Sequence, residues 1–100
     1  MKFRLLLIAV LVVKSSATWA ISGNELLELM QRDNKLAAMM YIRGVFDVLN
    51  GDRFCAPKNA TAGQIYDLVQ SHLKGLPQFR HHNAAVLIGG SLETVYPCSK

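Results

Sequence analysis

Apolar residues form one unbroken run near the start of the chain, whereas further along they recur every three or four positions. Lys2 and Arg4 precede the run, which covers residues 5–13, and Lys14 ends it. Mostly small or polar residues then follow up to Ala20. A positive segment, a short apolar segment and a small-residue cleavage site are, in this order, the three parts of a secretory signal peptide. The beginning of the chain therefore indicates export.

A membrane anchor is the alternative interpretation of this segment. A bilayer-spanning helix needs about 20 apolar residues, and the run ends well short of that length. We expect residues 1–20 to be a signal peptide that is cleaved after Ala17 or Ala20. Residues 21–100 then form a single domain, small enough that its hydrophobic core alone leaves it only marginally stable.

Beyond the signal peptide, the intervals of three and four residues predict four helices and no convincing strand. The first helix begins at Ser22, where Glu25 completes a capping box, and ends at residues 32–34. The second covers residues 35–49, and its apolar stripe is so broad that we expect this helix to be buried on more than one side. The stripe comprises Leu36, Met39, Met40, Ile42, Val45, Phe46, Val48 and Leu49. Gly44 lies in the middle of this helix, where glycine makes the helix about 1 kcal/mol less stable than alanine would. Its presence there therefore predicts a close approach to another backbone.

The other two helices have equally clear beginnings. Thr61 with Gln64 forms a second capping box, and Asn83 can cap the last helix, which ends before Pro97. Gly89–Gly90 within the last helix predicts tight packing against a neighbour. The expected apolar faces comprise Ile65, Leu68, Val69, His72 and Leu73 in the third helix, and Ala84, Leu87, Ile88, Ser91, Leu92 and Val95 in the fourth. The predicted fold class is therefore all-α, a small four-helix bundle-like domain.

The chain has two cysteines, Cys55 and Cys98. In an oxidising compartment they allow only one intramolecular pairing. A bridge between two copies of the chain and a reactive thiol are the alternatives, but neither cysteine has a CxxC partner or a cationic setting that would activate it. We expect a structural disulfide that closes the bundle by joining the C-terminus to the loop between the second and third helices. In the chain-entropy model such a bridge stabilises the fold by about 4 kcal/mol.

Export changes the meaning of the net charge, which is +4 for the whole chain. Three of the 11 lysines and arginines lie within the signal peptide, whereas all 7 acidic residues follow it. Eight cations then face seven acids, and the exported domain has a net charge of +1. This balance does not indicate a nucleic-acid partner, and no membrane association is expected once the signal peptide is removed.

Few residues of the exported domain are suited to catalysis. His72 lies on the apolar face of the third helix, where a partly buried histidine is more often structural. His81 and His82 are adjacent, so we expect their side chains to diverge and not to bind one metal ion together. Ser91 lies inside a helix without the GxSxG elbow of a serine hydrolase. We therefore predict no catalytic residues, no metal site and no cofactor.

The connector between the third and fourth helices is the segment that stands out. It covers residues 76–82, lies next to Lys74, and is polar and cationic. Binding residues concentrate in loops that a rigid scaffold holds, although an ordinary solvated turn explains the pattern equally well. The candidate partner-binding residues are Gln78, Phe79, Arg80, His81 and His82.

Ordered motifs across the exported domain resemble the Tai/Rap group of immunity proteins, which neutralise peptidoglycan amidases delivered by type VI secretion systems. The motifs are Gly23–Leu27, Tyr41–Asp47, an FCxP element at Phe54–Pro57, a TxGQ element at Thr61–Gln64, Pro77, Arg80–His81, Asn83–Ala85 and Tyr96–Cys98. The resemblance implies a periplasmic all-α inhibitor without catalytic activity, often a homodimer, that binds an amidase effector and places a surface loop in its active-site cleft. For this chain it implies a role for residues 78–82.

The chain departs from the family pattern at one place, and two other functions stay open. Relatives commonly have a second cysteine pair between the first two helices, where this chain has Met30 and the stretch 38–40. Methionine can fill the space of a buried bridge as an adaptable apolar residue. The alternative function is a periplasmic acid-stress chaperone of the HdeA kind, which is also small, helical and singly bridged. An enzyme that acts on peptidoglycan fragments is the third hypothesis.

Overall fold

Four α-helices build the domain in the computed structural model, which describes residues 20–32 and 34–99. The helices are α2 (Gly23–Gln31), α3 (Lys35–Leu49), α4 (Ala62–Gly75) and α5 (Ala84–Val95), and a 3₁₀ turn, η1 (Pro77–Phe79), follows α4. Within these described residues there is no strand, only two isolated bridges. The all-α prediction is confirmed, whereas the predicted signal peptide lies outside the described residues except for Ala20.

The helices begin where the polar residues of the sequence predict. Both capping boxes form: the Ser22 hydroxyl accepts a hydrogen bond from the Glu25 amide at 3.1 Å, and the Thr61 hydroxyl accepts one from the Gln64 amide at the same distance. The Asn83 side chain caps α5 by accepting from the Ala85 amide at 2.9 Å. Each cap satisfies an amide that the helix itself leaves without a partner.

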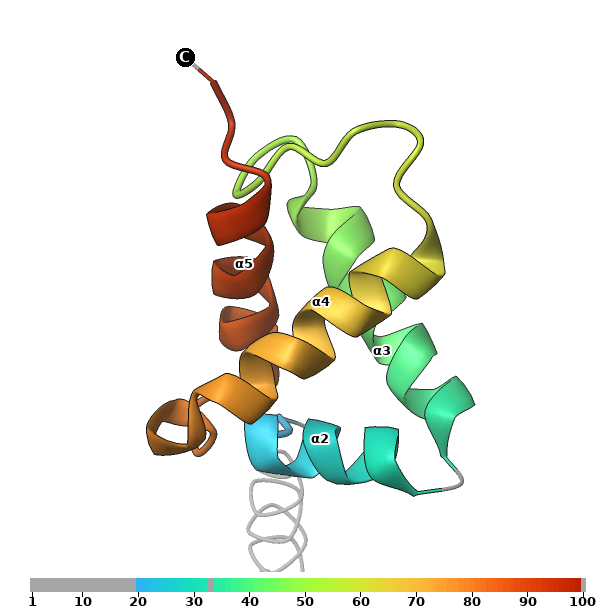
Figure 1. Ribbon diagram of the computed structural model, residues 1–100, viewed down its shortest axis with the longest axis vertical. Coiled ribbons are helices and arrows are strands. Elements are labelled where there is room, and N and C mark those ends of the chain that lie inside the picture. Colours follow the sequence, from blue (N-terminus) through green and yellow to red (C-terminus); the bar gives the residue numbers. More distant parts are fainter. Residues whose placement is uncertain (1–19, 33, 100) are drawn as a thin grey trace, which may run out of the picture.

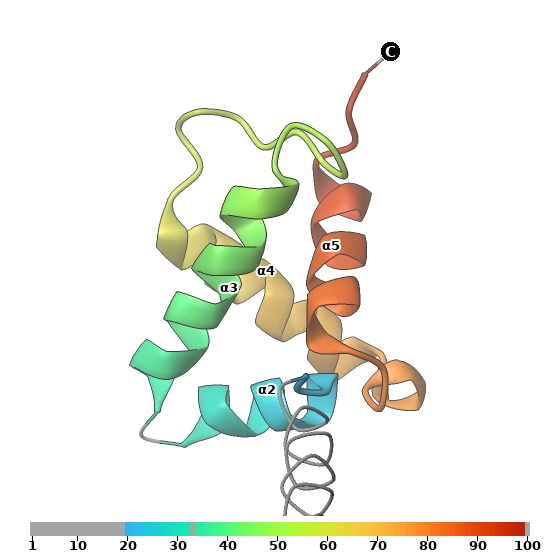
Figure 2. The ribbon, with the colours of Figure 1, turned by 180° about the vertical axis from the view of Figure 1, so that it is seen from behind.

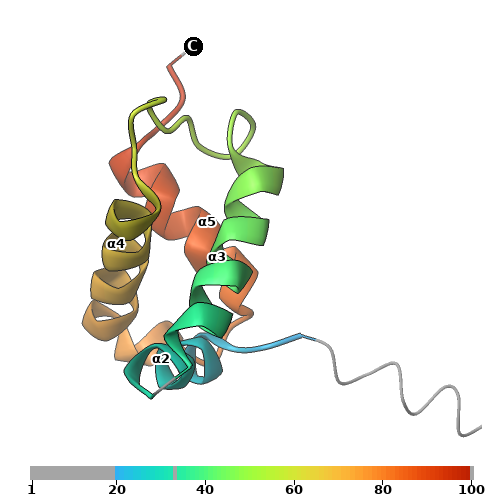
Figure 3. The same ribbon diagram turned by 90° about the vertical axis from the view of Figure 1, so that its right-hand side faces the viewer.

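Three of the helices cross around one core, and the fourth closes one end of it. In Figure 1, α3 and α5 stand side by side, α4 crosses in front of them, and α2 lies across the end opposite the C-terminus. Figure 2 shows the same arrangement from behind, and Figure 3 shows α2 nearly end-on beneath the others. The buried core takes residues from every helix: Leu26, Leu27, Met30, Ala38, Ile42, Phe54, Ile65, Tyr66, Val69, Leu73, Ala84, Ile88 and Leu92.

The loop between α3 and α4 contributes the largest fully buried side chain. Phe54 is completely buried and its ring lies 5.3 Å from that of Phe46 on α3. The neighbouring Cys55 forms the predicted disulfide with Cys98, with 4.8 Å between the two Cα atoms. The Cys55 amide also donates to the Tyr96 carbonyl at 2.8 Å. The disulfide prediction is confirmed, and the loop it anchors is also part of the core.

Apolar packing joins α2 to its neighbours at the place where the resemblance implies a second cysteine pair. Met30 and Ala38 are both buried, and the Tyr66 hydroxyl on α4 donates to the Met30 carbonyl at 3.4 Å. Burial raises the pKa of the Tyr66 phenol above its ordinary value of 10.0, and the negative charge of Asp67 raises it further. A buried methionine and a buried tyrosine hydrogen bond therefore hold α2 in place here.

Several sequence predictions about packing are wrong. Helix α3 is buried on one side only, and Leu36, Met40 and Val48 are exposed. A Cβ atom at Gly44 would meet nothing within 4 Å, so no backbone approaches it. In α5, Val95 is exposed and Gly90 has open space beside it, whereas Gly89 does pack tightly, with Leu49 3.2 Å from a built Cβ. Among the described helices, no segment has the length and apolar character needed to cross a bilayer.

Candidate functional site

The connector between α4 and α5 is tied to the beginning of α2 by its own backbone. The Gly23 amide donates to the His82 carbonyl at 2.9 Å, and the Asn24 amide donates to the Arg80 carbonyl at 2.8 Å. In return, the Ala84 amide donates to the Ile21 carbonyl at 2.8 Å. The first amides of a helix have no partner within it, so the connector carbonyls satisfy groups that otherwise need water. Two segments about 60 residues apart in sequence thereby become one unit.

Gly23 makes this close approach possible because it has no Cβ atom. A Cβ built at this position would lie 3.0 Å from the Arg80 carbonyl oxygen and 3.3 Å from the Arg80 Cα atom. It would also lie 2.5 Å from Cδ1 of Leu87. Gly23 is not among the residues that the sequence predicts for this site. The available signal was a glycine directly after the Ser22 cap, but the segment that packs on it can be found only in the structure.

The side chains of the connector point to solvent from this fixed backbone. Gln78, His81 and His82 are exposed, and Phe79 is 46% exposed. The rings of His81 and His82 lie 4.3 Å apart, and the rings of Phe79 and His82 lie 6.0 Å apart. The expectation that the two histidine side chains diverge is therefore wrong. Three adjacent rings form an aromatic surface at this end of the bundle.

Arg80 is the half-buried member of the connector. Its Nε atom is buried and has no hydrogen-bond partner, although the residue as a whole remains partly accessible. A guanidinium carries five donors in a rigid fork that matches a carboxylate or a polarised carbonyl. Because the Nε atom is buried, a partner in solution would have to pair with the other donors of the guanidinium.

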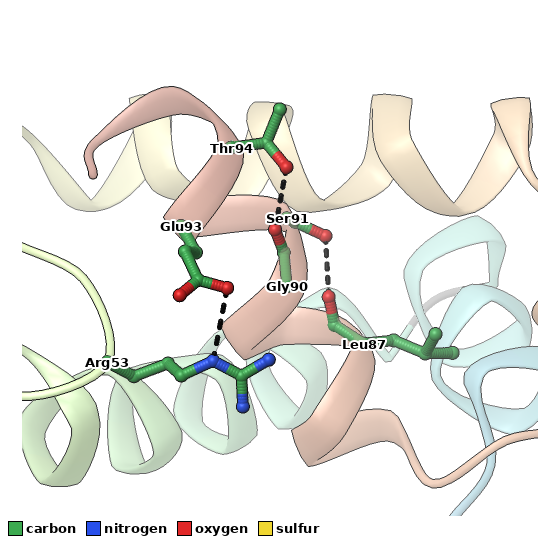
Figure 4. A network of polar contacts seen from close by, with 6 residues as sticks. All are labelled: Arg53, Leu87, Gly90, Ser91, Glu93 and Thr94. Atoms are coloured by element: carbon green, nitrogen blue, oxygen red, sulfur yellow. Dashed lines mark hydrogen bonds and ion pairs between the residues drawn. The ribbon is translucent and has the colours of Figure 1, made fainter.

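The other residues considered for chemistry lie in packing positions. His72 is half-buried on α4, and Ser91 is buried with its hydroxyl donating to the Leu87 carbonyl at 2.7 Å (Figure 4). Burial also raises the pKa of the Tyr41 phenol, a shift that a hydrogen bond with the Ala85 backbone partly offsets. Across residues 20–32 and 34–99, no group of three or more His, Cys, Asp or Glu side chains is placed to hold a metal ion.

Polar contacts at the opposite end of the bundle are structural. Arg53, in the loop after α3, pairs with Glu93 on α5 at 3.3 Å (Figure 4). The Thr94 hydroxyl donates to the Gly90 carbonyl of its own helix at 2.9 Å, as the same view shows. Both members of the ion pair are largely exposed, so the pair adds less than about 1 kcal/mol to the stability. It positions the disulfide loop against α5.

One surface groove lies away from every predicted site residue. It runs between α3 and the beginning of α4, has a volume of about 190 Å³, and has an apolar floor that includes Met39, Phe46 and Ile65. Arg43 and Asp47 line its edge and face each other at 3.8 Å. The groove contains no histidine or cysteine, so it resembles a contact surface more than a reaction site.

Comparison with known proteins places this geometry in a family. A search of curated proteins gives no match. The sequence matches the family described as Rap1a immunity proteins over residues 22–98, which is nearly the whole of the domain and includes both cysteines, the connector and the beginning of α2. The chain therefore belongs to the family of Rap1a immunity proteins.

Proposed function

We propose that this immunity protein acts in the periplasm, where it binds a peptidoglycan amidase delivered by a type VI secretion system and inhibits it without any catalytic step. The family membership supports binding to a secreted effector. The order of charged, apolar and small residues at the start of the chain supports export. The amidase is proposed from the resemblance of the motifs, and the connector is proposed as the segment that enters its cleft.

The observation that carries the proposal is the rigid support of an exposed loop. Backbone hydrogen bonds of 2.8 and 2.9 Å hold the connector on α2, while Phe79, His81 and His82 remain accessible. A loop that is already ordered loses little conformational entropy on binding, so more of its contact energy appears as affinity. An inhibitor needs this property because it must occupy the cleft more stably than a flexible substrate does.

The side chains suit a cleft that binds peptides. Aromatic and arginine side chains contribute strongly to protein interfaces, because they cover a large area and hydrogen-bond at their ends. Phe79 and the two histidine rings provide an aromatic surface of three tilted rings, and Arg80 provides donors for an acidic or carbonyl group. We expect Arg80 to pair with an acceptor in the amidase and the rings to cover the cleft around it.

Charge reversal at Arg80 tests the proposal. The mature protein is mixed with the amidase, and peptidoglycan hydrolysis and the dissociation constant are measured. We expect Arg80→Glu to weaken the complex by at least tenfold, because an opposite charge replaces the donors at the centre of the contact. Lys58→Glu is the matched control, since Lys58 is an exposed cation in the loop at the other end of the bundle. Equal binding by Arg80→Glu and the parent would show that the connector is not the contact.

A further inference from the structure

The turn after α3 contains the one Asn-Gly pair of the sequence. Asn50 is the C-cap residue of α3, and Gly51 follows it with a φ of 95°. Glycine adopts this left-handed conformation without steric cost, so the turn requires a glycine here. Asparagine is one of the thermolabile residues of proteins, and the amide of a following glycine is the least hindered nucleophile that its side chain can meet. Both residues are exposed. The fold therefore places a chemically reactive pair at the surface.

Hydrogen bonds within the loop restrain both reacting groups of this pair. The Gly51 amide donates to the Phe54 carbonyl at 2.7 Å. The Oδ1 atom of the Asn50 side chain accepts from the Ala56 amide at 3.0 Å. The first bond holds the proton that the glycine nitrogen must lose before it can attack. The second fixes the side chain, so its Cγ atom is not free to rotate onto that nitrogen.

The two residues that hold the pair lie on either side of a disulfide cysteine. Phe54 precedes Cys55 and is completely buried, and Ala56 follows it. Cys55 is bonded to Cys98, and its amide donates to the Tyr96 carbonyl at 2.8 Å. Figure 1 shows this loop at the end of the bundle where α5 ends. Loops open locally when few contacts hold them, so the disulfide protects the Asn-Gly pair by holding the residues that restrain it.

We propose that Asn50–Gly51 is a deamidation site that the disulfide-closed loop protects and that reacts in chains without the disulfide. The Gly51 nitrogen gives its proton to the solvent and forms a bond with Cγ of Asn50. The bond from Cγ to the side-chain nitrogen breaks, and this nitrogen takes a proton from the solvent and leaves as ammonia. Water then opens the resulting succinimide at either of its carbonyl groups, giving aspartate or isoaspartate. Nothing is oxidised or reduced, and water is the only co-reactant.

The two products have different effects on the loop. Aspartate keeps an oxygen at the position of Oδ1, so it can accept the same hydrogen bond from the Ala56 amide. In isoaspartate the main chain runs through the carbon atoms of the former side chain, so the Gly51 amide is displaced from the Phe54 carbonyl. A chain whose disulfide forms too late therefore loses the turn irreversibly. The loop lies at the end of the bundle opposite the connector, so this proposal does not depend on the amidase.

Peptide mass spectrometry of the mature protein, kept in warm and mildly alkaline buffer, tests the proposal. Deamidation raises the mass of the peptide by the difference between water and ammonia. We expect the Cys55→Ser/Cys98→Ser double variant to convert Asn50 at least tenfold faster than the oxidised parent, because its loop opens more often. Leu73→Ala is the matched control and should convert Asn50 much more slowly than the double variant. It empties a buried site near the connector end of α4 and leaves the disulfide intact.

The parent unfolded in urea provides the rate of the unprotected pair. If the double variant does not fold, it should react at this rate, and the comparison with Leu73→Ala still decides. Equal rates in the oxidised parent and the double variant, or in the double variant and Leu73→Ala, would overturn the proposal. So would an oxidised parent that reacts as fast as the chain in urea.

Asn59 is an internal control for the role of glycine. It is exposed in the same loop but is followed by Ala60, so it should keep its amide while Asn50 reacts. Conversion of both at the same rate would show that Gly51 does not direct the reaction. The isoaspartate fraction, separated by chromatography, should melt below the Asn50→Asp variant. Equal melting temperatures would refute the irreversible loss of the turn.

Discussion

Replacing Gly23 by alanine tests whether the connector depends on its close contact with α2. The new methyl group would lie 3.0 Å from the Arg80 carbonyl oxygen and 3.3 Å from its Cα atom. These are backbone atoms, so no side-chain rotation relieves the contact. The third neighbour, Cδ1 of Leu87 at 2.5 Å, ends a flexible side chain and can move. The connector backbone must therefore shift away from the first turn of α2.

The expected destabilisation is about 1–3 kcal/mol, the usual cost of inserting a methyl group into a packed site. The shift also lengthens the hydrogen bonds that the Gly23 and Asn24 amides donate, at 2.9 and 2.8 Å, to the connector. For a domain of this size, 1 kcal/mol corresponds to about 4–8 °C in melting temperature. We expect Gly23→Ala to melt at least 4 °C below the parent, the lower figure of that range.

Gly90→Ala is the matched control because it makes the same chemical change in the middle of α5. No atom lies within 4 Å of the position of its Cβ, so the only effect is the better helix propensity of alanine, about 0.5–1 kcal/mol. We expect this variant to melt above the parent. Thermal unfolding followed by circular dichroism measures both, and hydrogen exchange of the Asn24 amide reports the connector contact directly. If Gly23→Ala were as stable as Gly90→Ala, with an unchanged Asn24 exchange rate, the connector would not depend on the glycine.

Four further outcomes follow from the core and its ionisable groups. Replacing Cys55 and Cys98 together by serine should cost about 4 kcal/mol in urea unfolding, and a reductant should reproduce the loss in the parent. Phe54→Ala should cost about 3–5 kcal/mol, because it empties a completely buried site. Burial raises the pKa of Tyr66 above 10.0 in the folded state. The neutral phenol therefore contributes to the free energy of unfolding below about pH 10, and this contribution is lost as the pH rises through the raised pKa. In an alkaline titration, Tyr66→Phe should lose less stability than the parent. An acid-stress chaperone would unfold near pH 2–3, so unchanged circular dichroism there, with no protection of client proteins, would exclude that function.

Features that depend on neighbouring residues in the sequence could be predicted from it. The caps at Ser22, Thr61 and Asn83 form because each polar side chain reaches an amide two or three residues ahead. No other part of the fold has to be known for this interaction. The disulfide was predictable for a different reason, since two cysteines in an exported chain leave one intramolecular pairing.

Features that depend on distant segments could not be predicted in this way. Phe54 lies in a segment without helical periodicity, so its complete burial against Phe46 becomes visible only when the loop folds back. The contact of Gly23 with Arg80 likewise joins residues 57 positions apart. The connector's residues were predictable as a polar segment between two helices, but its rigid attachment to α2 was not.

The exposed face of α3 shows a third relation between sequence and structure. Hydrophobic periodicity reports which side of a helix is more stable away from water, and it contains no information about which molecule covers that side. The pattern of α3 predicts two covered sides, and the domain supplies a cover for one. Gly44 shows the same difference, because a helix-weakening residue with open space around it has no function within the domain. The pattern therefore identifies the apolar residues of α3 correctly, but which of them the domain buries follows only from how α2, α4 and α5 pack against this helix.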